Sequence, residues 1–122
     1  ISGSSMYIKG SIVTYSNEAK MKFLDVDKEI LDTKGAVSPE VAKQMAEGVR
    51  KAVGSDIGVG ITGIAGPTGG TDKKPVGLVY IAVAGKDNTV VKENVFSGDR
   101  ARVRYRSTQQ ALEMIRQYIK NK

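Results

Sequence analysis

Apolar residues recur every three to four positions in two long stretches of the chain, which predicts two amphipathic helices. The first covers residues 39–53, where valine or methionine recurs at every fourth position. Ser38 before it is a typical N-cap, and Gly54 stands where a helix ends. The second covers residues 99–120, with Asp99 placed to cap its first turn. Each helix therefore has one face to bury and one to expose.

Shorter stretches rich in β-branched and aromatic residues predict four strands, at residues 7–16, 56–62, 76–85 and 89–96. The letters GKDN between the last two predict a hairpin, and residues 17–26 predict a further short helix. The order is strand, helix, helix, strand, strand, strand, helix. We expect an α/β protein, a three-layer α/β/α domain with a mixed sheet.

Residues 60–77, GITGIAGPTGGTDKKPVG, form a glycine-rich segment between two of these strands. The letters GVGITG match the dinucleotide-binding fingerprint, but they lie within a strand, and Pro67 follows where the fingerprint needs a helix. A P-loop is excluded because no Gly-Lys-Ser/Thr closes the run. A long flexible connection stays open as an alternative. We favour a ligand-contacting loop, since long loops inside compact domains are more often functional and bare backbone offers N–H donors.

The composition, with 40% hydrophobic and 26% charged residues, is that of an ordinary globular protein. Histidine and cysteine are both absent, which excludes Ser-His triads and cysteine nucleophiles and disfavours structural zinc. An enzyme built from this chain needs Ser, Thr, Lys, Tyr or a carboxylate as its nucleophile. Its base must be Lys, Tyr or a carboxylate.

The formal net charge of +6 is concentrated in residues 97–122, which hold seven basic and two acidic side chains. A basic terminal segment can bind nucleic acid or a phosphorylated small molecule, although most such charges belong to a solvated helix face. Aromatic residues make up only 6% of the chain and no recognition motif occurs. Nucleic-acid binding is therefore the weakest of the hypotheses.

Four blocks of the sequence resemble one known family: VTYSNEAK (13–20), GAVSPEVAKQMAEGVR (35–50), TGIAGPTGGTDKKPVG (62–77) and FSGDR (96–100). In this order they are similar to the C-terminal domain of the CinA family, competence/damage-inducible protein A. That family is known as nicotinamide mononucleotide deamidase, so the resemblance implies a nicotinamide-nucleotide amidohydrolase. The family's Glu-Ser-Cys-Thr-Gly-Gly motif has no match here. We expect residues 1–122 to be a single CinA C-terminal-like domain that is incomplete at its N-terminus.

The resemblance also implies catalytic roles for three residues. Ser5 matches the nucleophile of the family, Lys20 its base, and Tyr15 a hydroxyl that assists them. In a chain without His or Cys, a Ser–Lys pair is the simplest arrangement available. A lysine acts as a base near neutral pH only where desolvation or a nearby cation favours its neutral form. From the residues alone, two alternatives stay open: that Lys20 is an exposed lysine on a helix, and that Ser5 is a serine in a turn.

Substrate binding is expected at two further places. Thr62, Gly63 and Gly66, at the start of the glycine-rich segment, would contact the amide, the ribose or the phosphate. Arg100 and Arg102 would hold the phosphate where a guanidinium and a helix N-terminus act together. The alternatives are that Thr62 caps a turn at the end of a strand, and that Arg100 and Arg102 pair with a nearby acid.

The expected partner is a small nucleotide substrate, with no cofactor, no metal, no nucleic acid and no membrane. The resemblance implies a homo-oligomer, and the lack of cysteine and of a signal-peptide pattern favours a cytoplasmic location. A second function stays open, namely a non-catalytic nucleotide-binding module associated with the competence or damage response. Nucleotide binding without turnover would distinguish it from the amidohydrolase.

Overall fold

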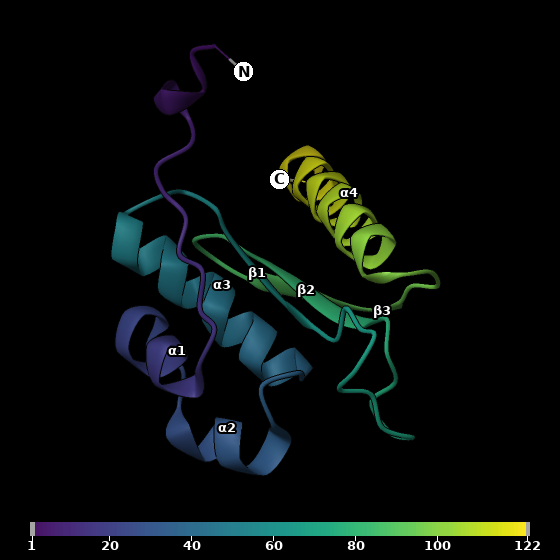
Figure 1. The fold of residues 1–122 in the computed structure, drawn as a ribbon. Coiled ribbons are helices and arrows are strands. Elements are labelled where there is room, and N and C mark those ends of the chain that lie inside the picture. Colours follow the sequence, from purple (N-terminus) through teal and green to yellow (C-terminus); the bar gives the residue numbers. More distant parts are fainter. Residues whose placement is uncertain (1, 122) are drawn as a thin grey trace.

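The computed structural model describes residues 2–121 and arranges them in three layers (Figure 1). The middle layer is a sheet of β1 (Gly58–Gly63), β2 (Leu78–Ala84) and β3 (Thr89–Val95). Helices α1 (Asn17–Leu24), α2 (Lys28–Lys34) and α3 (Pro39–Val53) lie on one side of it, and α4 (Arg100–Lys120) covers the other. A short 3₁₀ turn, η1 (Ser4–Met6), lies near the N-terminus. The expected α/β class and three-layer arrangement are confirmed.

The strands pair in the order β1-β2-β3, and both pairs are antiparallel. The hairpin expected between β2 and β3 is confirmed, with the Gly85 N–H donating to the Asn88 carbonyl at 2.9 Å. Within residues 2–121 no strand pair is parallel. The described sheet is therefore antiparallel, whereas the sequence predicts a mixed one. The difference arises at residues 7–16, which form no strand. Their β-branched residues favour a strand only where a neighbouring strand accepts the backbone groups.

Glycines in β1 allow α3 to pack directly against the sheet. A Cβ added at Gly60 would strike the Ala42 carbonyl oxygen and lie 2.7 Å from the Ala46 nitrogen, both in the α3 backbone. Gly58 is equally close to α3, since an added Cβ there would strike the Ala46 carbonyl oxygen. The fingerprint-like letters of β1 therefore serve close helix–sheet packing, which agrees with the exclusion of a dinucleotide site.

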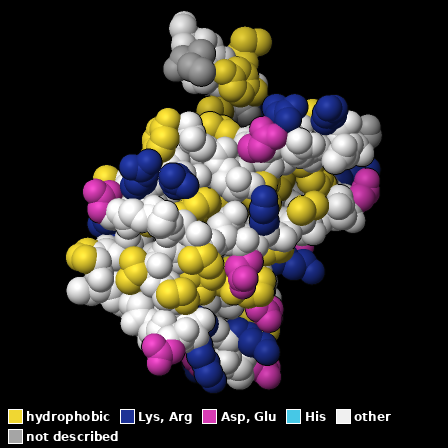
Figure 2. Space-filling model, turned by 90° about the vertical axis from the view of Figure 1, so that its right-hand side faces the viewer, with side chains coloured by type: hydrophobic (Ala, Val, Ile, Leu, Met, Phe, Trp, Pro, Cys, Tyr) yellow, Lys and Arg dark blue, Asp and Glu magenta, His cyan; other side chains and the backbone are white. Residues whose placement is uncertain are grey.

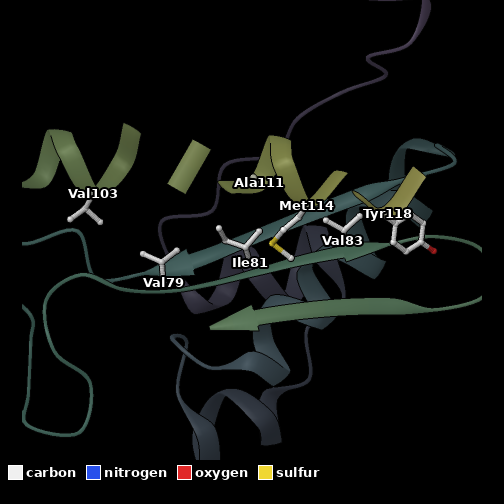
Figure 3. Close-up of a cluster of buried hydrophobic side chains, with 7 residues drawn as sticks. All are labelled: Val79, Ile81, Val83, Val103, Ala111, Met114 and Tyr118. Atoms are coloured by element: carbon white, nitrogen blue, oxygen red, sulfur yellow. The ribbon is translucent and has the colours of Figure 1, made fainter. Parts of the chain in front are cut away.

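The hydrophobic core on the other side lies between β2 and α4. Figure 3 shows the side chains from the two elements pointing toward one another: Val79, Ile81 and Val83 from β2, and Val103, Ala111, Met114 and Tyr118 from α4. They alternate along the strand and recur with helical spacing along α4, as the sequence predicts. The Tyr118 hydroxyl donates to the Asn88 side-chain oxygen at 2.8 Å and so ties the end of α4 to the hairpin.

Caps set the helix ends where the sequence predicts them. The Asp99 carboxylate accepts from the Arg102 N–H at 2.9 Å at the start of α4, and Gly54 ends α3 with a φ of 65°. Helix α2 was not expected from the sequence. It has only seven residues, too few for a periodic pattern to distinguish it from a loop.

Replacing the α3 cap in Ser38→Ala is expected to lower the free energy of unfolding by about 1 kcal/mol. The buried Ser38 hydroxyl accepts from the Val41 N–H at 3.3 Å and donates to the Gly35 carbonyl at 2.9 Å. Alanine leaves both backbone groups without this partner. Urea denaturation measures the loss, and Ser38→Thr, which keeps the hydroxyl, should lose less. Equal losses in the two variants would contradict this role of the hydroxyl.

Candidate functional site

Helix α1 places a lysine in the interior of the protein. The Lys20 side chain is buried, with the residue only 8% exposed, and its Nζ donates to the Thr14 carbonyl at 3.4 Å. Within residues 2–121 no carboxylate lies within ion-pair distance of this amine. Burial lowers the pKa of Lys20 from its ordinary value, because desolvation disfavours the ammonium. The exposed-lysine alternative is wrong, and the amine has an environment suited to a general base.

Local sequence explains how α1 buries this lysine. Ser16 caps the helix by accepting from the Ala19 N–H at 3.0 Å, which fixes where α1 begins. Lys20 and Leu24 then share the buried face of the helix. In α3, a Cβ added at Gly48 would strike the Leu24 carbonyl oxygen, so this glycine lets α1 pack tightly on α3.

The other two expected catalytic residues are exposed, unlike Lys20. The Tyr15 side chain is 95% exposed. Ser5 belongs to η1, which has no buried residue and which, within residues 2–121, makes only local backbone hydrogen bonds. Figures 1 and 2 both show this N-terminal turn standing clear of the three layers. Within one chain, therefore, the structure brings Ser5 neither to Lys20 nor to the glycine-rich segment.

The glycine-rich segment forms an anchored loop between β1 and β2. The Ile64 N–H donates to the Leu78 carbonyl at 2.9 Å, and the Gly77 N–H donates back to the Ile64 carbonyl at 2.7 Å. Further along the loop, the Lys74 Nζ donates to the Lys34 carbonyl at 2.6 Å. That carbonyl lies at the C-terminal end of α2, where the helix dipole favours a cation. These contacts disfavour a loose connection and hold the loop against α2.

Thr62 and Gly63 lie where β1 leads into this loop. Thr62 is buried, and its hydroxyl donates to the Ala36 carbonyl at 2.7 Å, which ties the end of the strand to the α2–α3 connection. This contact agrees with the alternative of a threonine that fixes a strand end. The Thr62 hydroxyl oxygen keeps lone pairs that can accept a hydrogen bond from a ligand. A Cβ at Gly63 would lie 2.7 Å from the Val79 side chain, so β1 and β2 stay close here.

Two expected binding residues meet between the loop and α4. The Arg100 guanidinium donates to the Gly66 carbonyl at 3.1 Å, and Gly66 has a φ of 85°, a backbone conformation that favours glycine. Arg102 lies beside an open groove of about 730 Å³ that is also lined by Tyr105 and Arg106. Asp99 caps α4 through its carboxylate, and within residues 2–121 neither Arg100 nor Arg102 forms an ion pair with an acid. The candidate residues thus fall into two parts: the lysine part, which is Lys20 on α1, and the arginine part, which is Arg100 and Arg102 at the start of α4 with the Gly66 carbonyl of the loop.

The surface adds little to this arrangement. In Figure 2 the Lys and Arg side chains are dispersed among hydrophobic ones and form no single basic patch on the face shown. Among the described helices, none combines the length and the hydropathy needed to cross a bilayer. Residues 2–121 also hold no group of three or more acidic side chains suited to a metal ion. The candidate functional site consists of the lysine part, with its buried amine, and the arginine part, with its contact to the loop.

The protein is thus a three-layer α/β domain with a buried helix lysine and a glycine loop bound to an arginine. A family model described as the CinA C-terminal domain matches residues 1–119. The chain belongs to the CinA C-terminal domain family.

Relatives of known sequence support this membership. A CinA-like protein of Koribacter versatilis is 55% identical over 119 residues, 98% of this chain. A CinA-like protein of Syntrophomonas wolfei is 52% identical over 121 residues, 99% of this chain. The chain spans 29% of the length of each of these two relatives.

A solved structure supports the fold as well. The competence/damage inducible protein CihA from Agrobacterium tumefaciens is 41% identical to this chain, with a TM-score of 0.92. The match covers 94% of this chain and 71% of that one. A competence damage-inducible protein A from Klebsiella pneumoniae is 36% identical with a TM-score of 0.81, over 84% of this chain and 64% of that one. The α/β architecture is therefore shared with solved members of the superfamily.

Proposed function

We propose that this chain is an amidohydrolase domain that hydrolyses the carboxamide of nicotinamide mononucleotide, giving nicotinate mononucleotide and ammonia. The observation that carries the proposal is the environment of Lys20, a buried amine without a carboxylate partner in the described part of the chain. Burial lowers its pKa and so increases the share of neutral amine near neutral pH. The substrate class follows from the resemblance to nicotinamide mononucleotide deamidase.

In this proposal Lys20 and Ser5 act as base and nucleophile. The neutral Lys20 amine takes the proton of the Ser5 hydroxyl while the oxygen attacks the carboxamide carbon. The tetrahedral intermediate expels ammonia, which receives that proton from the Lys20 ammonium, and an ester remains on Ser5. Water then attacks the ester with Lys20 again as base, which releases the carboxylate and restores the serine. The Tyr15 hydroxyl assists these proton transfers.

The arginine part would hold the phosphate of the nucleotide. One N–H of Arg100 is used on the Gly66 carbonyl, so the guanidinium is held against the loop while its other donors stay available. Arg102 would add a second cation at the start of α4. Thr62 and Gly63, at the entrance to the loop, would contact the amide or the ribose.

Ammonia release from nicotinamide mononucleotide tests the proposal. Ser5→Ala and Lys20→Met are each expected to lose activity by about a hundredfold or more, the usual contribution of such groups. Lys22→Met, which replaces an exposed lysine of the same helix, is the matched control and should stay active. Full turnover in either catalytic variant would contradict the assigned roles.

A non-catalytic nucleotide-binding module is the second candidate, and the position of Ser5 outside the layers favours it. Calorimetry with nicotinamide mononucleotide separates the two functions. Heat of binding together with the absence of ammonia release from the wild-type protein would support the module. Ammonia release by the wild-type protein would reject it.

Arg100→Ala is expected to raise the KM for nicotinamide mononucleotide by about tenfold or more, the usual effect of losing a charge-assisted hydrogen bond. The KM for nicotinamide riboside, which has no phosphate, should change little. Steady-state kinetics with both substrates measures the difference. Arg104→Ala, an exposed arginine of the same helix, is the control. An equal rise for both substrates would argue against a phosphate contact.

A further inference from the structure

Two side chains of the glycine-rich segment bind the place where α2 leads into α3. The Lys74 Nζ donates to the Lys34 carbonyl at 2.6 Å, and the Thr62 hydroxyl donates to the Ala36 carbonyl at 2.7 Å. Residues 34–36 are here called the α2–α3 junction. Figure 1 shows this junction and the glycine-rich segment at the same end of the molecule. One side chain near each end of the segment is therefore fixed to a single place in the helical layer.

The α2–α3 junction has room and a favourable field for the Lys74 amine. Gly35 has a φ of 81°, and a Cβ added there would lie 2.9 Å from the Lys74 Nζ. A larger residue would therefore crowd the amine. The Lys34 carbonyl belongs to the last turn of α2, where carbonyls without a helical partner and the helix dipole both favour a cation. The contact is a charge-assisted hydrogen bond, which is stronger than a neutral one.

Lys74 also closes the turn that precedes it. Its carbonyl accepts from the Thr71 N–H at 2.8 Å, and its N–H donates to the Thr71 hydroxyl at 3.0 Å. Residues 67–73 are exposed, and within residues 2–121 these two bonds to Lys74 are the only hydrogen bonds that they make. The exposed tip of the segment is thus hydrogen-bonded to the helical layer through the Lys74 side chain.

We propose that Lys74 is a positioning residue that holds the glycine-rich segment in the form that binds the substrate. It acts through the segment and does not touch the reacting atoms. Lys74 fixes the later part of the segment to α2, while Arg100 fixes Gly66 in its earlier part. The backbone between these two attachments is then presented to the nucleotide in one arrangement. This inference rests on the proposed function, because its ligand is the substrate of that reaction.

Steady-state kinetics in the full-length natural protein tests the role of Lys74. Without its amine the segment would spend only part of the time in the binding form, so Lys74→Met should raise the KM for nicotinamide mononucleotide by about tenfold. The kcat should change less than about twofold, because the proposed base, Lys20, is untouched. Lys73→Met, the exposed neighbouring lysine, is the matched control and should leave the KM unchanged. An unchanged KM in Lys74→Met would overturn the inference and leave the proposed function standing.

A second variant breaks the same contact from the other side. Gly35→Ala would place a Cβ 2.9 Å from the Lys74 Nζ, so it should raise the KM as Lys74→Met does. The double variant should show no further rise, because the contact is already lost. Gly54→Ala controls for backbone strain, since Gly54 also has a positive φ but no atom within 4 Å of an added Cβ. Effects that multiply in the double variant would overturn the role given to the contact.

Hydrogen exchange tests the attachment of the segment without relying on activity. The Thr71 and Lys74 amides, which bond within the turn, should exchange about tenfold faster in Lys74→Met than in Lys73→Met. Amides of β2 should exchange equally in both, which distinguishes a local release from general destabilisation. Equal exchange at the turn would overturn the inference. A protein that shows the expected difference but releases no ammonia would reject the proposed function and leave the attachment by Lys74 standing.

Discussion

Lys20→Met is expected to lower ammonia release by about a hundredfold or more and at the same time to raise the free energy of unfolding by about 1 kcal/mol at neutral pH. Methionine has a similar length and fills the same space, but it carries no charge to desolvate. The wild-type amine is buried and has one long hydrogen bond, of 3.4 Å, and no carboxylate partner among residues 2–121. The wild-type protein would thus be less stable than the variant, because it keeps a buried amine. Urea denaturation and an ammonia assay on the same preparations measure both effects.

The stability gain should depend on pH in a defined direction. The pKa of Lys20 is lower in the folded chain than its ordinary value of 10.5, so the unfolded chain binds more protons between these two values. Wild-type stability therefore rises with pH through this window, whereas methionine does not titrate. The advantage of the variant is full below the folded pKa and disappears above 10.5. A variant less stable than the wild type at pH 7 would contradict the desolvated amine.

Gly60→Ala is expected to lower the free energy of unfolding by about 3 kcal/mol or more. The added Cβ would lie 2.7 Å from the Ala46 nitrogen and would strike the Ala42 carbonyl oxygen. Both atoms belong to the α3 backbone, which cannot rotate away as a side chain can. The helix must therefore move off β1, which also displaces Thr62 at the end of the strand and should weaken substrate binding.

Thermal unfolding measures this effect, because each kcal/mol shifts the Tm of a domain of this size by about 4 °C. Gly54→Ala is the matched control. Gly54 has a φ of 65°, but no atom lies within 4 Å of an added Cβ. The free energy of unfolding of this variant should therefore fall only because alanine disfavours a positive φ, by about 1 kcal/mol. Similar shifts in the two variants would show that backbone conformation, and not contact with α3, determines the loss.

The two parts of the candidate site differ in how far they are assembled. Arg100 already contacts Gly66 in the single chain, so the proposed phosphate contact needs no partner. The lysine part holds the buried Lys20 amine in place, whereas Ser5, its proposed partner, lies outside the layers.

Several features of the fold were predictable from the sequence because each depends on residues close together in the chain. Ser38 and Asp99 cap α3 and α4 because a cap acts within a single turn. The hairpin at residues 85–88 follows from its turn residues, and the core face of α4 from its spacing. The absence of His and Cys restricts the candidate nucleophiles and bases through composition alone. The roles of the site residues stay predictions.

Other features were decided only by the tertiary structure, since they depend on contacts between segments far apart in sequence. Lys20 is buried because Gly48 lets α1 approach α3, and nothing in the pattern of α1 indicates that approach. The contact of Arg100 with Gly66 joins residues 34 positions apart. Residues 7–16 have the composition of a strand but pair with none in the described chain, because a strand needs a partner and composition cannot supply one. Periodicity thus determines which faces are apolar, and packing determines what each face meets.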